Sequence, residues 1–135
     1  MPVQTSGHFT YDDWQEQSLT AQDASPRLSR ASVANTFTGG IEAAGTACAY
    51  TNVYLTPETG SFTGLEVFTG TLDGRRGSFV AEERGVFGAD GTVHCTFEVV
   101  AGSGTGELAG LRGTGSFTHR QGGTTVPYTF TYELD

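Results

Sequence analysis

Short stretches in which apolar and polar residues alternate recur along the whole chain, and glycine-rich turns separate them. An alternation with a period of two gives a β-strand one apolar and one polar face, and no stretch of about 12 residues shows the period of an amphipathic helix. The turns have the composition of hairpin connections, as in TGG, TPETG, DGRRG, GADG and QGG. The pattern predicts an all-β chain whose eight strands span residues 7–14, 31–38, 41–55, 62–72, 78–87, 92–101, 112–120 and 125–134.

Short turns between consecutive strands favour antiparallel neighbours, and eight such strands can close into an up-and-down barrel without exposed sheet edges. A chain of 135 residues has the size of one domain, so we expect a single eight-stranded, mainly antiparallel barrel over residues 1–135. The polar segment QEQSLTAQDASPRLSR, residues 15–30, is expected to connect the first two strands. The interior of such a barrel is either filled by side chains or shaped around one small ligand.

The chain is acidic, with a net charge of −8, and all seven of its basic residues are arginines. Nucleic acids and anionic membranes both attract basic surfaces, so neither partner is expected. The absence of lysine excludes a Schiff-base mechanism and a Walker A phosphate loop. The start of the chain, MPVQTSGHFTYDD, lacks the basic and apolar parts of a signal peptide, so a cytoplasmic location is expected, with Cys48 and Cys95 as reduced thiols.

The segment GSGTGELAGLRGTGSF contains the spacing G-x-G-x-x-A at Gly104, Gly106 and Ala109, which also occurs in dinucleotide-binding turns. A dinucleotide site needs a preceding parallel strand, a following helix and a crossover unit of about 30 residues. Only residues 107–111 could form a helical turn before the next strand. The segment is therefore interpreted as a glycine-rich corner, and no nucleotide or other cofactor is expected.

In its context VVAGSGTGELAGLRGTGSF, this corner resembles a segment that allene oxide cyclases and plant dirigent proteins share. With LSRASVANTFTG, GLEVFTGTLDGRRGSF and the ending YTFTYELD, the chain is similar to a small actinobacterial family of unknown function assigned to the allene oxide cyclase barrel fold. The resemblance implies a calycin-like barrel that assembles as a homodimer or homotrimer. Relatives include isomerases, natural-product cyclases and proteins that steer radical coupling, so the resemblance leaves the reaction open.

The period of two also assigns side chains to faces, and the face that carries the aromatic residues is expected to point into the barrel. On residues 41–55 either Cys48, Tyr50, Asn52 and Tyr54 or the alternate set faces inward, and the tyrosines favour the first set. Ten inward residues are expected to contact an apolar small molecule: Asn35, Phe37, Tyr50, Phe68, Phe79, Cys95, Phe97, Phe117, Tyr128 and Phe130.

The same face carries Glu66, Glu83 and His119, which are the candidate catalytic residues. Desolvation would raise the pKa of an inward carboxyl group and allow it to act as an acid or base near neutral pH. In the resembling family the position of Glu83 is commonly histidine, so any chemistry of that histidine would be altered here. The alternative is that both carboxyl groups lie at the barrel mouth, in solvent or paired with Arg112 or Arg84.

The leading hypothesis is a cofactor-independent isomerase or cyclase that acts on an apolar, polyketide- or lipid-derived substrate inside the barrel. A non-catalytic carrier and a filled barrel without ligand are the alternatives. No metal site is expected, because neighbours such as His94 and Cys95 point to opposite faces of a strand, and His8 and His119 lack ligand spacing. Trp14 is expected to pack over one end of the barrel.

Overall fold

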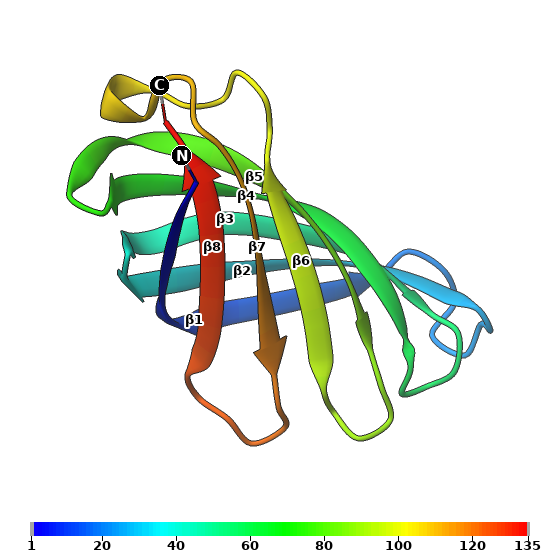
Figure 1. Ribbon diagram of the computed structural model, residues 1–135. Coiled ribbons are helices and arrows are strands. Elements are labelled where there is room, and N and C mark those ends of the chain that lie inside the picture. Colours follow the sequence, from blue (N-terminus) through cyan, green and yellow to red (C-terminus); the bar gives the residue numbers. More distant parts are fainter. Residues whose placement is uncertain (1, 135) are drawn as a thin grey trace.

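The computed structural model describes residues 2–134 and shows a closed barrel in which each strand pairs antiparallel with the next (Figure 1). Hydrogen bonds between the first and last strands close the barrel, and Val3 lies opposite Tyr132. The predicted all-β, eight-stranded antiparallel barrel is confirmed. Its strands are β1 (Val3–Ser18), β2 (Arg27–Gly39), β3 (Ile41–Tyr54), β4 (Gly60–Leu72), β5 (Arg75–Phe87), β6 (Val93–Val99), β7 (Arg112–His119) and β8 (Val126–Glu133).

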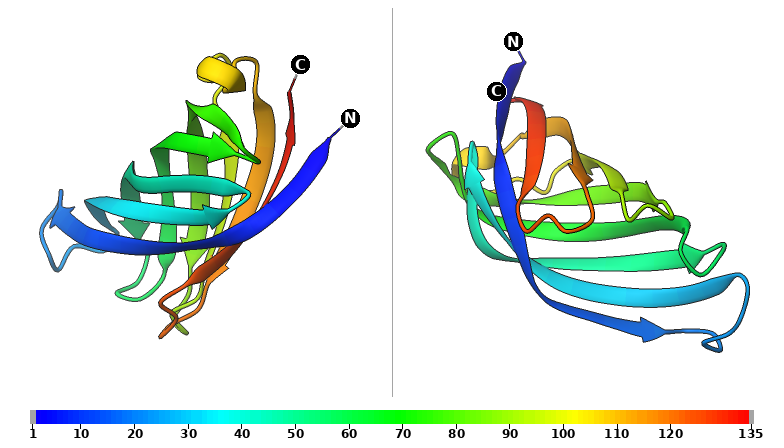
Figure 2. Two further views of the ribbon diagram at one scale, coloured as in Figure 1. Left: turned by 90° about the vertical axis from the view of Figure 1, so that its left-hand side faces the viewer. Right: turned by 90° about the horizontal axis from the view of Figure 1, so that it is seen from below.

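The first hairpin is longer than the sequence predicts. Residues 15–18 continue β1 and residues 27–30 begin β2, so the expected connection over residues 15–30 shrinks to residues 19–26. The two strands pair along this extension, with Glu16 opposite Ala31 and Ser18 opposite Ser29. Figure 2 shows this hairpin reaching outward at the end of the barrel away from both termini.

The glycine-rich corner closes the other end of the barrel. It forms a single 3₁₀ turn, η1 (Gly106–Leu108), next to the termini (Figures 1 and 2). Leu108 and Leu111 are buried there and pack into the main hydrophobic core. A turn of three residues provides no helix for a dinucleotide, so the interpretation as a corner holds and the segment serves as an apolar plug.

Stacked aromatic rings fill the half of the barrel beneath this plug. The ring centres of Phe68 and Phe79 lie 4.7 Å apart with an interplanar angle of 9°, and Phe130 stacks with both Phe97 and Tyr132. Each fully buried ring of this kind stabilises the fold by roughly 1.5–3 kcal/mol. This half of the interior is therefore a packed core.

Glycines make room for inward aromatic rings on neighbouring strands. A Cβ atom on Gly64 would lie 2.6 Å from Cδ1 of Tyr50 and 2.2 Å from the carbonyl oxygen of Ala49. Gly64 is opposite Tyr50 in the β3–β4 register, so the ring of Tyr50 lies across the glycine backbone. The close approach fixes the position of Tyr50 in the barrel wall.

Two bulges change which side chains face inward. On β1 the register shifts between Asp12 and Gln15, and Asp13 adopts a left-handed conformation with φ 56°. On β3 the register shifts around Gly45, whose φ is 63°. Each extra residue reverses the alternation beyond it.

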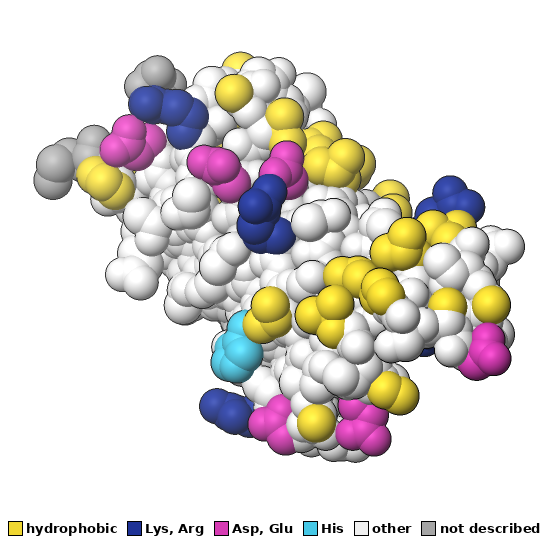
Figure 3. Space-filling view, turned by 90° about the vertical axis from the view of Figure 1, so that its right-hand side faces the viewer, with side chains coloured by type: hydrophobic (Ala, Val, Ile, Leu, Met, Phe, Trp, Pro, Cys, Tyr) yellow, Lys and Arg dark blue, Asp and Glu magenta, His cyan; other side chains and the backbone are white. Residues whose placement is uncertain are grey.

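The outer surface carries several exposed apolar side chains, including Leu65, Val67 and Val86. Figure 3 shows apolar side chains gathered in a band on one side of the molecule, with acidic and basic side chains around them. Within residues 2–134 no helix is long and apolar enough to cross a lipid bilayer.

Candidate functional site

A cavity of about 430 Å³ opens at the end of the barrel opposite η1. Its volume is within the range of roughly 300–1,000 Å³ that is typical of small-molecule sites. The β3–β4 and β5–β6 loops contribute Glu58 and Gly88 to its mouth. Eight aromatic residues line it: Phe9, Tyr11, Trp14, Tyr50, Tyr54, Phe62, Phe87 and Phe117.

The bulge in β1 places Trp14 at the mouth of this cavity. The Trp14 ring is 6.3 Å from the Tyr50 ring and half exposed, and its Nε1 donates a 3.4 Å hydrogen bond to Glu16. The hydroxyl of Tyr54 donates to the other oxygen of the Glu16 carboxylate at 2.5 Å. The expectation that Trp14 packs over one end of the barrel agrees with this placement, but the residue also forms part of the cavity wall.

Glu16 is held as a carboxylate at the rim. Burial alone would raise its pKa, but hydrogen bonds from Ser29, Tyr54 and Trp14, together with the charge of Arg27, outweigh burial and lower the pKa. The guanidinium carbon of Arg27 lies 4.0 Å from the centre of the Tyr54 ring. The rim therefore contains a cation–π contact and an ionised carboxylate side by side.

Two buried carboxyl groups lie behind the cavity wall. Glu66 on β4 and Glu83 on β5 are each 1% exposed, and a carboxylate oxygen of one lies within 4.8 Å of an oxygen of the other. Tyr50 Oη donates to Glu83 Oε1 at 2.8 Å, and Asn35 Nδ2 donates to Glu66 Oε2 at 2.7 Å. Two residues that line the cavity, Asn35 and Tyr50, are thus each hydrogen-bonded to one buried carboxyl group.

The surroundings of Glu83 favour its protonated form. Desolvation raises the pKa of Glu83 well above its ordinary value, and the hydrogen bond with Glu66 and the negative charge of Glu66 raise it further. Thr46 Oγ1 donates a second hydrogen bond, of 2.5 Å, to Glu66 Oε2, so this oxygen accepts from two neutral donors. Burial, followed by the charge of Glu83, also raises the pKa of Tyr50, which therefore keeps its hydroxyl proton at neutral pH.

Both cysteines are free thiols buried beside the carboxyl pair. Potential ligand atoms of Cys48, Glu66 and Glu83 lie within 4.8 Å of one another, so these three residues could approach one metal ion. Burial and the two carboxyl charges raise the pKa of Cys48, and burial and the charge of Glu83 raise that of Cys95. A metal ion there would have to displace the protons that these raised pKa values hold on Cys48 and Glu83.

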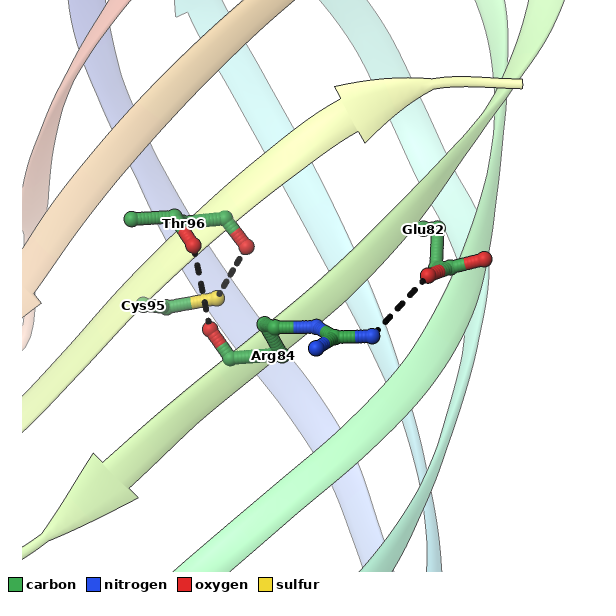
Figure 4. A network of polar contacts seen from close by, with 4 residues as sticks. All are labelled: Glu82, Arg84, Cys95 and Thr96. Carbon is green, nitrogen blue, oxygen red and sulfur yellow. Dashed lines mark hydrogen bonds and ion pairs between the residues drawn. The ribbon is translucent and has the colours of Figure 1, made fainter. Parts of the chain in front are cut away.

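The alternative placement of the carboxyl groups in solvent at the mouth, or in pairs with Arg112 or Arg84, is wrong. Arg84 extends along the outside of the barrel to Glu82, at 3.4 Å, as Figure 4 shows. Arg112 pairs with Glu133 at 3.2 Å. The reason is the period of two, which sends Glu83 inward while its neighbours Glu82 and Arg84 point outward.

The structure separates the predicted contact residues into two groups. Asn35, Tyr50 and Phe117 line the cavity, and the preferred inward set on β3 is confirmed by the burial of Cys48, Tyr50 and Asn52. The other seven predicted contact residues are buried elsewhere in the interior: Phe37, Phe68, Phe79, Cys95, Phe97, Tyr128 and Phe130.

The three candidate catalytic residues are not gathered at one point. His119 lines the cavity near the mouth, where its Nε2 lies 2.9 Å from the carbonyl oxygen of Gly123 and its ring contacts Tyr11 edge to face. Glu66 and Glu83 reach the cavity only through Asn35 and Tyr50. The carboxyl pair therefore faces the cavity through the amide of Asn35 and the phenol of Tyr50, while His119 lines it separately.

Thr46 and Glu16 belong to the site but are not among the residues predicted from the sequence. Thr46 faces inward because the bulge at Gly45 reverses the alternation of β3, and a glycine inside a predicted strand is the signal for such a bulge. Glu16 lies in the segment predicted to be a connection, and no local pattern identifies it, because its partners Ser29 and Tyr54 come from β2 and β3.

These features define a small antiparallel barrel with one plugged end and one open, aromatic cavity. The chain belongs to the family described as "Protein of unknown function (DUF3224)", whose model matches residues 5–132. A similar solved structure is the crystal structure of a protein with unknown function from the DUF3224 family of Shewanella oneidensis MR-1. It is 26% identical, with a TM-score of 0.82, and the match covers 100% of this chain and 98% of that chain. No curated protein matches the sequence.

Proposed function

We propose that this barrel binds an apolar small molecule in the cavity at its open end. The observation that carries the proposal is the contrast between the two halves of one interior. Phe68, Phe79 and Phe130 pack against one another in the plugged half, whereas the aromatic side chains of the open half surround about 430 Å³ of space. A stable barrel needs no such space, and a ligand would bury the exposed rings.

We further propose that the bound molecule undergoes cofactor-independent isomerisation or cyclisation, as expected for a polyketide- or lipid-derived substrate. Tyr50 would donate its hydroxyl proton to one carbon of the substrate, and the resulting phenolate, hydrogen-bonded to Glu83, would take a proton from another carbon. Asn35, which uses one N–H on Glu66, has a second N–H for a substrate carbonyl. Each proton taken from one carbon returns to another, so the reaction consumes no co-reactant.

A non-catalytic carrier is the second candidate, and the burial of the carboxyl pair favours it. Neither Glu66 nor Glu83 lines the cavity, and both have hydrogen-bond partners within the protein. In a carrier, these carboxyl groups would only fix the positions of Asn35 and Tyr50.

Titration with 4-phenylbutanol tests binding. Trp14 is the one tryptophan of the chain, so its emission reports on the cavity mouth directly. We expect a saturable change in emission and heat of binding by calorimetry. A Phe62→Trp substitution fills the cavity from its wall and should weaken binding, whereas Val86→Trp, on the outer surface, should not. No binding of this alcohol to the wild-type protein would contradict the proposed cavity function.

Deuterium exchange into 2-tetralone separates an enzyme from a carrier. This apolar ketone has acidic C–H bonds, and removal of one of these protons is the first step of an enolisation. An enzyme should accelerate exchange in D₂O above the buffer rate, and Tyr50→Phe should abolish the acceleration. Tyr54→Phe is the matched control, because Tyr54 also lines the cavity and donates to a carboxylate, but at the rim. Ketone binding without acceleration would favour the carrier.

Three expectations from the sequence complete the proposal. The allene oxide cyclase-like ancestry of the barrel and the cytoplasmic location are retained as proposals. A homodimer or homotrimer is also proposed, and the exposed Leu65 and Val67 on β4 offer an apolar contact beside Ala47 and Ala49 of β3. Light scattering on the wild-type protein and on Leu65→Lys would test the assembly, because a lysine at the contact should give monomers.

A further inference from the structure

The rim of the cavity has a distinctive charge pattern. Among the residues that line the cavity within the described chain, Glu58 is the only one with a fixed charge, and none of the seven arginines lines it. The Glu16 carboxylate lies directly behind Trp14 and Tyr54 and accepts a hydrogen bond from each. A ligand that enters the mouth therefore meets aromatic rings and negative charge.

Aromatic faces next to carboxylates attract organic cations. The negative face of an indole or phenol ring binds ammonium groups, and a nearby carboxylate adds a Coulombic attraction. The rim already holds one such contact, since the guanidinium of Arg27 lies over the Tyr54 ring. Trp14, the strongest ring for this interaction, is half exposed at the mouth.

We propose that the cavity selects amphipathic cations, with the apolar body of the ligand inside the barrel and an alkylated ammonium group at the rim beside Trp14, Tyr54 and Glu58. This inference rests on the proposed binding function and specifies its ligand class. It also disfavours fatty acids and other amphipathic anions, because their carboxylates would face Glu58 and the charge of Glu16.

Arg27 is the group that could reverse this preference. Its charge acts on Glu16, which lowers the pKa of that carboxyl group, and its guanidinium covers one face of Tyr54. Arg27 does not line the cavity, so an anion at the mouth meets Glu58 first. Removal of Arg27 should free a ring face and leave Glu16 without its basic neighbour, which would strengthen the binding of a cation.

Three matched probes test the charge preference: 4-phenylbutyltrimethylammonium, 4-phenylbutanol and 4-phenylbutyrate. They share one apolar body and differ only in the group at its end. Differences among their dissociation constants therefore measure how the rim interacts with that group. We expect the ammonium probe to bind about tenfold more tightly than the alcohol, and the carboxylate to bind more weakly than the alcohol. Calorimetry gives the constants without relying on Trp14.

Variants assign the preference to the rim. Glu58→Gln should reduce the ratio of the dissociation constants of the alcohol and the ammonium probe about threefold. Glu98→Gln changes the net charge equally but lies on the outer face of β6, so it should leave this ratio unchanged. Trp14→Leu should remove most of the preference for the ammonium probe over the alcohol, and Arg27→Gln should increase this preference.

The outcomes separate this inference from the proposed function. If the alcohol binds but the ammonium probe binds no more tightly, cation selectivity is wrong and the cavity function stands. If the carboxylate binds most tightly and Arg27→Gln abolishes its binding, the cavity is an anion site governed by Arg27. If none of the probes binds, both proposals fail.

Discussion

Tyr50 on the cavity wall donates a 2.8 Å hydrogen bond to Glu83, which is buried behind it. This contact joins the open half of the barrel to a carboxyl pair that water does not reach. Asn35 and Thr46 donate to Glu66, Tyr50 donates to Glu83, and the raised pKa of Glu83 favours its protonated form. The Tyr50 hydroxyl on the cavity wall is thereby linked by a hydrogen bond to the buried carboxyl group of Glu83.

The two carboxyl groups should respond differently to amide substitution. Glu83→Gln replaces a protonated acid by a group that can still accept from Tyr50 and donate to Glu66, so it should cost less than about 1 kcal/mol of unfolding free energy. Glu66→Gln can keep one oxygen for Asn35 and Thr46, which donate to the same atom, but its NH₂ group then faces the protonated Glu83, so it should cost about 1–3 kcal/mol. Urea denaturation compares the two variants. A larger loss in Glu83→Gln would show that the proton is not held on Glu83.

The raised pKa of Glu83 predicts a pH dependence of stability. Above pH 4.5, the ordinary value for this group, the unfolded chain loses the Glu83 proton while the folded protein keeps it. The folded state then binds more protons, so the contribution of Glu83 to the free energy of unfolding should fall as the pH rises above 4.5. Glu83→Gln removes this contribution, and the stability advantage of the wild-type protein over the variant should shrink across the same range. An advantage that grows with pH would contradict the assignment.

The barrel and the facing of its strands were predictable because they depend on local alternation. Period two sends Glu66, Phe68 and Phe79 inward, and all three are buried. The division of the interior was not predictable, because it depends on how deeply Leu108 and Leu111 of the corner enter the barrel.

The two β-bulges are the reason why the side chains that form the site could not all be predicted from the sequence. A bulge depends on how a strand pairs with its neighbour, so alternation alone gives the wrong face beyond it. On β1 the bulge directs Trp14 and Glu16 to the mouth. The two features that define the rim could therefore not be read from one strand.

Asp13 should be a strained position that supports Trp14. Its φ of 56° suits glycine, so Asp13→Gly should keep or raise stability by up to about 1 kcal/mol. Asp13→Val places a β-branched residue in the left-handed region and should cost about 1–3 kcal/mol. It should also weaken 4-phenylbutanol binding by displacing Trp14. Unchanged stability and affinity in Asp13→Val would contradict this role for the bulge.

The cysteines should be chemically silent in the folded protein. Burial raises the pKa of both Cys48 and Cys95, and the neighbouring carboxyl charges raise it further. We expect no reaction with Ellman's reagent at pH 8 within the time in which the urea-unfolded chain reacts completely. Rapid modification of one thiol in the folded protein would indicate solvent access to the carboxyl pair.

The central claim is that the open half of the barrel holds a ligand, and chemical-shift mapping with 4-phenylbutanol tests it most directly. Amide and aromatic signals of Tyr11, Trp14, Tyr50 and Phe117 should shift in a saturable way, while those of Phe68, Phe79 and Phe130 in the plugged half should remain in place. Saturable shifts confined to the outer surface, or none at saturating alcohol, would contradict the account.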